Sequence, residues 1–308
     1  MSTVIEVKGL TKKFGDLTAV NNIDLKLEQG KIYGFIGPNG AGKTTTMSLL
    51  VDLIKPTKGT ALIKKHEVGT IEAKKLLGYA PEFPSFYTDM TCIDYMIYMG
   101  RLGGLEYDEA VKKSLELLKY MELEGHLYKK VSKFSTGMKK KVGLAQAMIH
   151  DPEILLLDEP TANLDPTSRM DLVKTLKQLV KEKNLTLIIS SHVLTELELI
   201  ISDVIMINKG EVIKTGTLNE VKESFNSNEI IIKTDDNAKI KKLLKTDDLI
   251  GDIIEKDDKL IITTSDSKKT KKKIIKIVSD NDILLDLLTE QNVSLDDVYR
   301  NLVLGGEK

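Results

Sequence analysis

The chain has 308 residues, of which 41% are apolar, enough for one large α/β domain and a smaller one, each with a packed core. A net charge of -1 argues against a nucleic-acid protein that binds through bulk positive charge, and a single cysteine, Cys92, excludes an internal disulfide. The N-terminus has no stretch of signal-peptide type, and no window approaches the roughly 18 apolar residues of a membrane-spanning helix, so a membrane role requires a partner that spans.

The first part of the chain predicts strands that lead into a glycine-rich loop and a helix. Apolar and polar residues alternate over residues 3–8 and 23–28, as they do in half-buried strands. Residues 31–36 are more apolar and end at the glycine loop. A helix is expected to run from Gly42 to about Ile54, because Pro56 prevents it from continuing.

The glycine loop fits the phosphate-binding pattern G-x-x-x-x-G-K-[ST], in the strand–loop–helix setting that this pattern requires. Its residues are Gly37, Pro38, Asn39, Gly40, Ala41, Gly42, Lys43, Thr44 and Thr45. Glycines let the backbone wrap around phosphates, so that its N–H groups donate to them. Lys43 would supply positive charge at the β- and γ-phosphates, and Thr44 would offer its hydroxyl to Mg²⁺. The alternative is an ordinary glycine turn, which the setting disfavours.

The middle of the chain alternates helices with apolar strands. Residues 83–130 are predicted to be mainly helical, and a further helix is expected over residues 135–149. The apolar strand 154–157, a helix over about 167–183 and the buried strand 185–190 follow. Apolar strands that alternate with helices indicate a parallel sheet covered on both faces.

Two acids, Asp158 and Glu159, come directly after the strand 154–157. They are therefore expected at the carboxyl edge of the sheet, where nucleotide sites lie in open α/β folds. Asp158 would hold Mg²⁺ through water, and Glu159 would polarise the attacking water as general base. A strand followed by Asp-Glu is often only the start of a loop, but together with a phosphate loop it indicates nucleotide hydrolysis.

The composition changes near Lys222, since residues 222–308 contain 16 basic and 18 acidic residues, a higher charged fraction than the 30% of the whole chain. This segment predicts the order βαββαβ, the split βαβ arrangement. The expected elements are strand 229–233, helix 236–245, strand 250–255, strand 259–263, helix 267–279 and strand 283–288. A last helix is expected over 294–304, with Ser294 as its N-cap. The basic run 268–273 is either a binding patch or, as its flanking isoleucines favour, the solvated face of a helix.

A segment between the phosphate loop and the two acids resembles the signature of the ATP-binding-cassette (ABC) family, usually written Leu-Ser-Gly-Gly-Gln. In Phe134–Met138 the residues Ser135 and Gly137 match, whereas Thr136 and Met138 replace a glycine and the glutamine. A hydroxyl and backbone N–H groups at a helix N-terminus form an anion site. Taken alone, the segment is also compatible with a simple Ser N-cap.

Further segments resemble this family in the same order. Residues 162–165 resemble its D-loop, and His192 stands where the family has a switch histidine that contacts the γ-phosphate. Phe14 matches the aromatic residue that stacks on adenine, although a place in the core of a strand is the alternative. Glu82 departs from the family, which usually has glutamine there. A glutamate keeps a metal-facing oxygen but adds charge and loses the amide donor.

The resemblance covers residues 1–221 and implies an α/β fold: a P-loop NTPase core with a mixed sheet, an antiparallel β subdomain and a helical subdomain at about 83–150. Residues 222–308 are expected to form a small accessory α+β domain of ferredoxin-like type. The ending 293–302 is similar to the C-terminal extension of single-cassette subunits in drug, peptide and other export systems.

For function, the resemblance implies an ATPase that uses ATP and Mg²⁺. Glu159, His192 and Lys43 would be catalytic, and the metal would be held by Thr44, Glu82 and Asp158. The signature of one chain would complete the nucleotide site of another, so a homodimer would have two competent sites. Separate integral membrane permease subunits would hold the chain on the inner, cytoplasmic face of the cell membrane, and no nucleic acid is expected as a partner.

Several alternatives stay open at this stage. The chain can be an importer motor, a soluble cassette acting on ribosomes or DNA, or a regulatory module that binds ATP without turnover. The soluble cassettes usually carry a second cassette, a long coiled-coil insertion or a zinc site, and a regulatory module is expected to lack Glu159 or His192. The cluster of Phe83, Phe86 and Tyr87 either contacts a helix of a membrane partner or packs in the core.

Overall fold

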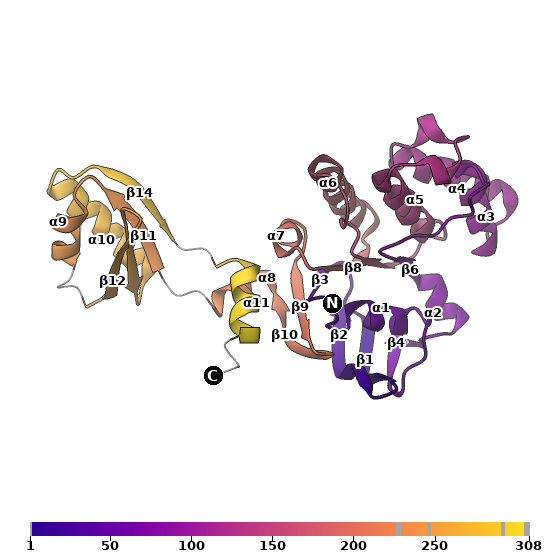
Figure 1. Cartoon of the computed structure of the whole chain (residues 1–308), viewed down its shortest axis with the longest axis horizontal. Coiled ribbons are helices and arrows are strands. Elements are labelled where there is room, and N and C mark those ends of the chain that lie inside the picture. The colour runs from indigo at the N-terminus through magenta and orange to yellow at the C-terminus, as the bar shows by residue number, and fades with distance from the viewer. Residues whose placement is uncertain (1, 226–228, 245–247, 291–292, 305–308) are drawn as a thin grey trace. The chain divides into compact units, whose positions relative to one another are not determined.

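The computed structural model describes residues 2–225, 229–244, 248–290 and 293–304 (Figure 1). The chain divides into two compact units, Met1–Leu218 together with Tyr299–Lys308, and Asn219–Val298. The first division lies close to the predicted limit between residues 221 and 222. The grouping of the chain from Tyr299 onward with the first unit differs from the expected domain 222–308.

An antiparallel sheet forms near the N-terminus of the first unit. Its strands are β1 (Thr3–Phe14), β2 (Leu17–Glu28), β4 (Lys58–Ile63) and β5 (His66–Glu67), in the order β2-β1-β4-β5. β1 and β2 are longer than the expected strands 3–8 and 23–28, because irregularities in their register let the pairing continue to the hairpin end at Phe14 and Leu17. The expected antiparallel β subdomain is confirmed.

The second sheet of this unit is mixed and carries the predicted site. Its order is β10-β9-β3-β8-β7-β6, and every neighbouring pair is parallel except the antiparallel hairpin of β9 and β10. The strands are β3 (Ile32–Ile36), β6 (Leu77–Ala80), β7 (Ile154–Asp158), β8 (Thr186–Ser191), β9 (Asp203–Asn208) and β10 (Glu211–Thr217). β7 and β8 are buried along their whole length, as their continuous apolar runs predict.

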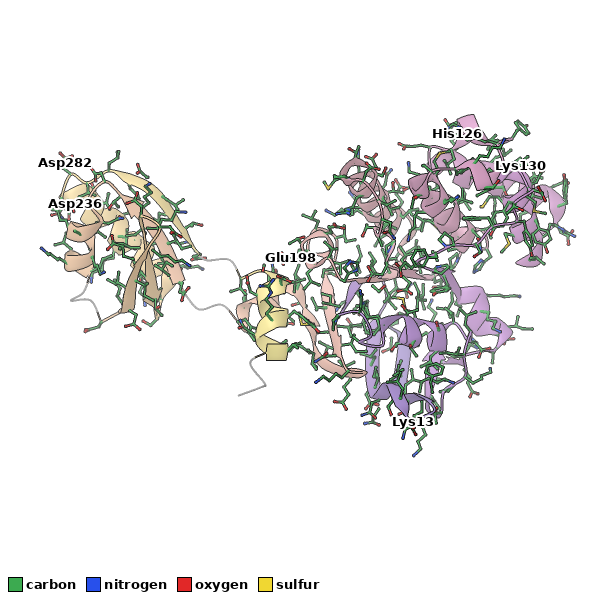
Figure 2. All side chains as sticks on the ribbon, in the orientation of Figure 1. Lys13, His126, Lys130, Glu198, Asp236 and Asp282 are labelled. Atoms are coloured by element: carbon green, nitrogen blue, oxygen red, sulfur yellow. The ribbon has the colours of Figure 1, made fainter. Side chains whose placement is uncertain are left out.

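Helix α1 (Lys43–Leu50) packs in one apolar core with strands of both sheets. Figure 2 shows the side chains of this unit, with Lys13 near the hairpin end of β1. It ends earlier than the predicted helix, because Asp52 adopts a left-handed conformation with φ 62°. The other helices outside the helical subdomain are α2 (Ile71–Leu76), α6 (Pro166–Lys183), α7 (Leu194–Leu197) and α8 (Leu218–Glu223). The carboxylate of Asp165 caps α6 by accepting a hydrogen bond from the N–H of Ser168.

The helical subdomain confirms the helical reading of this part of the chain. Its elements are α3 (Cys92–Leu102), α4 (Tyr107–Tyr120), the 3₁₀ turns Glu124–His126 and Val131–Lys133, and α5 (Thr136–Met148). Helix begins only at Cys92, so the first residues of the predicted stretch 83–130 are an exception, and Pro84 lies among them. Across the described ranges, no helix is long and apolar enough to cross a membrane.

The second unit is an antiparallel sheet covered by two helices. Its elements are β11 (Glu229–Thr234), α9 (Asn237–Leu244), β12 (Ile250–Lys256), β13 (Lys259–Thr264), α10 (Ser267–Asp280) and β14 (Leu285–Glu290). The strand order β12-β13-β11-β14 confirms the predicted βαββαβ arrangement. Residue 245 of the expected first helix lies outside the described residues. Alternate residues of the strands, such as Ile230 and Ile232, form the core with Ile240 and Ile274 of the helices.

The basic run of the second unit lies on α10, which buries Thr270, Ile274 and Val278. Most of its lysines are exposed, which supports the solvated-face reading. The last helix is α11 (Leu295–Leu304), and the structure confirms its predicted cap: the N–H of Asp297 donates to Oγ of Ser294 at 3.2 Å.

Candidate functional site

The phosphate loop joins β3 to α1, and two of its glycines leave no room for a side chain. A Cβ on Gly37 would collide with the backbone carbonyl of Ile207, and one on Gly42 with that of Ala19. Gly42 also has φ 105°, which favours glycine. No side chain caps α1, so the N–H groups of its first turn are available to an anion. The loop has the geometry of a phosphate cradle.

Lys43 begins α1 and is almost fully buried, with 6% of its side chain exposed. Its ammonium donates to the backbone carbonyls of Gly37 at 2.7 Å and Pro38 at 3.2 Å, and lies 3.7 Å from Oε1 of Glu159. Burial lowers the pKa of Lys43, and the carboxylates of Glu159 and Asp158 oppose this effect. The structure therefore brings the predicted lysine and the predicted base into one charge cluster.

Asp158 and Glu159 lie at the carboxyl end of β7, as predicted, and Ser190 of the neighbouring strand β8 holds both. The hydroxyl of Ser190 donates to Oδ1 of Asp158 at 2.5 Å and accepts from the N–H of Glu159 at 2.9 Å. Glu159 has φ 46°, a left-handed conformation that costs a non-glycine residue about 1–3 kcal/mol. The clamp by Ser190 helps to keep Glu159 in this conformation.

His192 follows β8 and contacts the same carboxylate. Its Nδ1 lies 2.9 Å from Oε2 of Glu159, while 48% of its side chain is exposed, against 8% for Glu159. The two oxygens of Glu159 thus face Lys43 on one side and His192 on the other. Glu159 therefore contacts both of the other residues expected to be catalytic, Lys43 and His192.

Glu82 lies in the loop after β6, and Lys140 of α5 reaches this loop. The ammonium of Lys140 donates to the backbone carbonyl of Glu82 at 2.5 Å and to that of Glu159 at 2.9 Å. Lys140 is 8% exposed. Burial lowers its pKa, and the carboxylates of Glu82, Asp158 and Glu159 raise it, in that order of strength.

Phe14 lies at the end of β1 with 49% of its surface exposed, so it is not part of the core. The ammonium of Lys12 lies 5.0 Å from the centre of its ring. Phe14 pairs with Leu17 across the hairpin, two residues before Ala19, whose carbonyl lies against Gly42 of the phosphate loop. An exposed aromatic ring is therefore available close to the loop.

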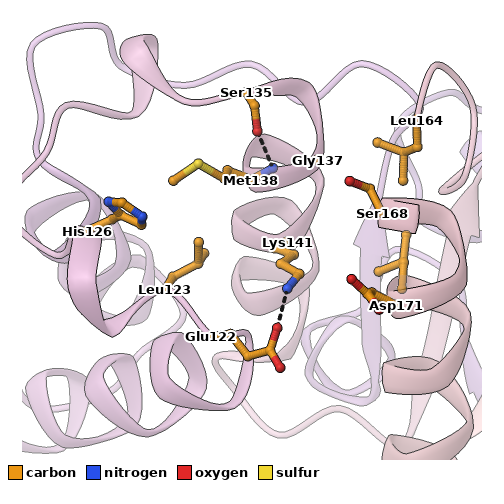
Figure 3. Close-up of a pocket in the computed structure, with 11 residues that line it drawn as sticks. Glu122, Leu123, His126, Ser135, Gly137, Met138, Lys141, Leu164, Ser168 and Asp171 are labelled. Atoms are coloured by element: carbon orange, nitrogen blue, oxygen red, sulfur yellow. Dashed lines mark hydrogen bonds and ion pairs between the residues drawn. The ribbon is translucent and has the colours of Figure 1, made fainter. Parts of the chain in front are cut away.

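Ser135 and Gly137 lie elsewhere, in a cavity of about 160 Å³ lined by α5, α6 and the turn that follows α4 (Figure 3). No residue of the phosphate loop lines this cavity. Ser135 caps α5, with its hydroxyl accepting from the N–H of Met138 at 3.3 Å, and Gly137 faces Ser168 of α6. The two interpretations of Ser135, as a helix cap and as part of an anion site, are compatible. The cap uses one N–H group of the first turn of α5, and the other N–H groups of that turn can still bind an anion.

Magnesium fits the residues at the carboxyl edge of the sheet. The candidate ligands, the carboxylates of Asp158 and Glu82 and the hydroxyl of Thr44, are the hard oxygen donors that this ion prefers. Among the described residues, no three His, Cys, Asp or Glu side chains gather as a metal cage. Mg²⁺ usually binds through one or two carboxylates together with substrate phosphates and water.

Two residues of this site escape sequence reasoning. Ser190 lies opposite Asp158 in the pairing of β7 with β8. A polar residue at the end of the predicted buried strand 185–190 is the sequence signal that could have identified it. Lys140 falls on the buried side of α5 among Val142, Gly143 and Leu144. A lysine on an otherwise apolar helix face is the corresponding signal.

Known families and proteins match both units. Residues 20–162 match the family model described as ABC transporter, and residues 216–303 match the C-terminal domain of DrrA1-3-like ATP-binding proteins. The bacitracin transport ATP-binding protein BcrA of Bacillus licheniformis is 33% identical over 308 residues, which covers 99% of each chain. The linearmycin resistance ATP-binding protein LnrL of Bacillus subtilis is 33% identical over 230 residues, covering 74% of each chain.

A solved structure shares the fold of the first unit. It is an ATP-binding cassette, captured as a dimer in a post-hydrolysis state with ADP and Pi. It is 26% identical, has a TM-score of 0.63, and the match covers 70% of the present chain and 98% of that one. Its match confirms the P-loop NTPase fold predicted for the first unit.

Proposed function

The chain belongs to the ATP-binding proteins of ABC transporters, and we propose that this ATPase drives the export of an antibiotic through separate membrane-spanning subunits. The observation that carries the proposal is that the similarity to a bacitracin transport ATP-binding protein extends over both units. A match to the cassette alone would fit an importer equally well. A match over the whole chain favours the kind of transport that this relative performs.

The contacts of Glu159 support two roles for this residue, as the partner of Lys43 and His192 and as the base in hydrolysis. Its carboxylate is the nearby anion for both Lys43 and His192. When ATP binds, its phosphates compete for these two partners, because they carry more negative charge and lie on the N–H groups of the phosphate loop. Lys43 then neutralises the β- and γ-phosphates, and His192 contacts the γ-phosphate.

Release from Lys43 and His192 leaves Glu159 able to act as general base. It accepts a proton from water as the water oxygen attacks the γ-phosphorus and the bond to the ADP oxygen breaks. Asp158, Thr44 and Glu82 are the residues that would hold Mg²⁺, which when bound supplies positive charge to the phosphate oxygens. Phe14 provides an aromatic ring on which the adenine can stack, because this ring is exposed and not packed in the core.

The position of Ser135 supports a site shared between two chains. It lies in a cavity that no phosphate-loop residue lines, so a single chain does not pair its signature with its own loop there. A head-to-tail homodimer would set the Ser135 end of α5 against the γ-phosphate held by the other chain. The free N–H groups of that helix end favour an anion.

The loop before α3 supports a contact with a membrane partner. Phe83 and Tyr87 are 71% and 55% exposed, while Phe86 packs edge-on against Tyr95 at 5.1 Å between ring centres. The contact with Tyr95 therefore accounts for Phe86, and Tyr87 packs edge-on against Tyr98 at 5.5 Å, which leaves Phe83 for a partner. We assign the chain to the inner face of the cell membrane, where its permease subunits hold it.

The test is to isolate the full chain from cell membranes by an affinity tag and identify the membrane protein that accompanies it. The pair is then placed in lipid vesicles, and ATP hydrolysis is measured with and without bacitracin. We expect bacitracin to stimulate hydrolysis, and Glu159→Gln, the matched control, to bind ATP without turnover. Cells that express the pair should also tolerate more bacitracin than cells that express the control. ATP-driven uptake into the cell, or recovery with ribosomes and no membrane protein, would refute the proposal.

A further inference from the structure

Lys140 is the second buried ammonium of the nucleotide site, and the steps described above do not use it. It extends from α5, the helix that Ser135 caps, to two loops of the sheet edge. Its hydrogen bonds to the carbonyls of Glu82 and Glu159 join three segments: the signature helix, the loop after β6 and the end of β7. No other residue in the described part of the site makes bonds to both of these carbonyls.

The charges around Lys140 are unbalanced without it. Three carboxylates, those of Glu82, Asp158 and Glu159, act on both Lys140 and Lys43. ATP adds further negative charge at the same place. Lys140 donates to the backbone of Glu82, whose carboxylate also helps to raise its pKa against the effect of burial. Lys43 instead lies 3.7 Å from a carboxylate oxygen of Glu159. The two buried ammoniums thus contact different acidic segments of the site.

We propose that Lys140 is a positioning residue that offsets the charge of Glu82 and holds the signature helix to the loops of Glu82 and Glu159. This inference rests on the proposed ATP-binding function. It explains how the site carries a carboxylate at a position where the family usually has a neutral glutamine. Lys140 offsets this charge in part: without its ammonium, Glu82 would repel the phosphates more strongly and the two loops would lose their common donor.

The test is a double-mutant cycle made of the wild-type chain, Glu82→Gln, Lys140→Gln and the double variant. The dissociation constant for ATP is measured with fluorescently labelled nucleotide in EDTA, so that metal binding by Glu82 does not contribute. Thermal unfolding is followed for each variant. Lys177→Gln, which removes a charge from the exposed side of α6, is the matched control for net charge.

We expect Lys140→Gln to weaken ATP binding at least 10-fold when Glu82 is present and no more than 3-fold when residue 82 is glutamine. Glu82→Gln alone should tighten metal-free ATP binding about 3-fold or more, because one of the carboxylates that act on Lys43 of the phosphate loop is removed. Lys177→Gln should change the constant less than 2-fold. These results would establish the pair.

Equal effects of Lys140→Gln in the two backgrounds would overturn the inference while leaving the proposed function intact. If Lys140→Gln does not fold, ATP binding by the Glu82→Gln variant becomes the test of the inference. The side chain of Glu82 is half-buried, so this variant is expected to fold. Unchanged or weaker metal-free ATP binding in Glu82→Gln would then overturn the pairing. A wild-type chain that binds no ATP would refute the proposed function itself, a result distinct from the others.

Discussion

Removal of the hydroxyl of Ser190 has an effect on the free energy of unfolding that can be calculated from its two hydrogen bonds. In Ser190→Ala the buried carboxylate of Asp158 loses a hydrogen bond that contributes about 1.5–3 kcal/mol. The N–H of Glu159 loses its acceptor in a place that water does not reach, at a cost of about 1–3 kcal/mol. The two effects together predict a loss of roughly 2.5–6 kcal/mol of unfolding free energy.

The assay is thermal unfolding of the full chain without nucleotide, together with ATP turnover. A change of 1 kcal/mol shifts the midpoint by roughly 2–4 °C in a domain of about this size, so Ser190→Ala should unfold at least roughly 5 °C lower. Turnover should fall about 10-fold or more, because Asp158 and the backbone of Glu159 are no longer held in place.

Ser191→Ala is the matched control, since Ser191 is equally buried but accepts only one hydrogen bond, from the N–H of Val193 at 2.9 Å. It should cost about 1 kcal/mol, which corresponds to a shift of roughly 2–4 °C. If the two variants unfold at the same temperature, the reasoning that assigns Ser190 a double role is wrong.

Four further predictions test other parts of the molecule. Glu159→Gln should bind ATP and accumulate as an ATP-bound dimer in size-exclusion chromatography, with no turnover; normal turnover would exclude Glu159 as the base. Ser135→Arg should fold and bind ATP but not hydrolyse it, and mixing it with Lys43→Ala should restore some activity because one intact site can form; full activity of Ser135→Arg alone would contradict a shared site. A chain that ends at residue 221 should fold and bind ATP, as circular dichroism and labelled nucleotide would show, whereas an insoluble product would mean that the tail is integral. Burial raises the pKa of the Cys92 thiol to about 12, so at pH 8 it stays protonated and should not react with a thiol reagent until the chain is denatured; rapid reaction in the native state would disprove this.

The parts of the fold that sequence reasoning predicts are those with strong local signals. Glycines at fixed spacing predict the phosphate loop, and a continuous apolar run predicts the strand before Asp158. The second unit alternates strands and helices with clear periods, and its order was predicted without a gap. Each of these signals is contained in a window of about 11–18 residues, so no distant contact is needed to read it.

The parts that escape prediction depend on distant contacts. The short strand β4 is stabilised by pairing with β1, more than 40 residues earlier, and β5 pairs in turn with β4. The sequences of both carry little strand signal of their own. The early end of α1 comes from a left-handed Asp52, which has salt bridges to Lys55 and Lys74. In the site, Ser190 and Lys140 act on loops far from them in the sequence, so only the assembled sheet reveals what they touch.

The narrow space around Gly37 and Gly42 has a consequence for how tightly a nucleotide can be held. Both glycines are enclosed by carbonyls from β9 and β2, strands of two different sheets, before any ligand arrives. Ordering a backbone residue costs about 1–2 kcal/mol of conformational entropy. Because folding has already ordered the loop, that entropy is not lost again on binding, and the loop acts as a preorganised receptor. A larger residue at either glycine would displace the carbonyl of Ile207 or Ala19 and disturb the backbone of the loop. Such a loop would have to become ordered each time a phosphate binds, and the affinity for nucleotide would fall.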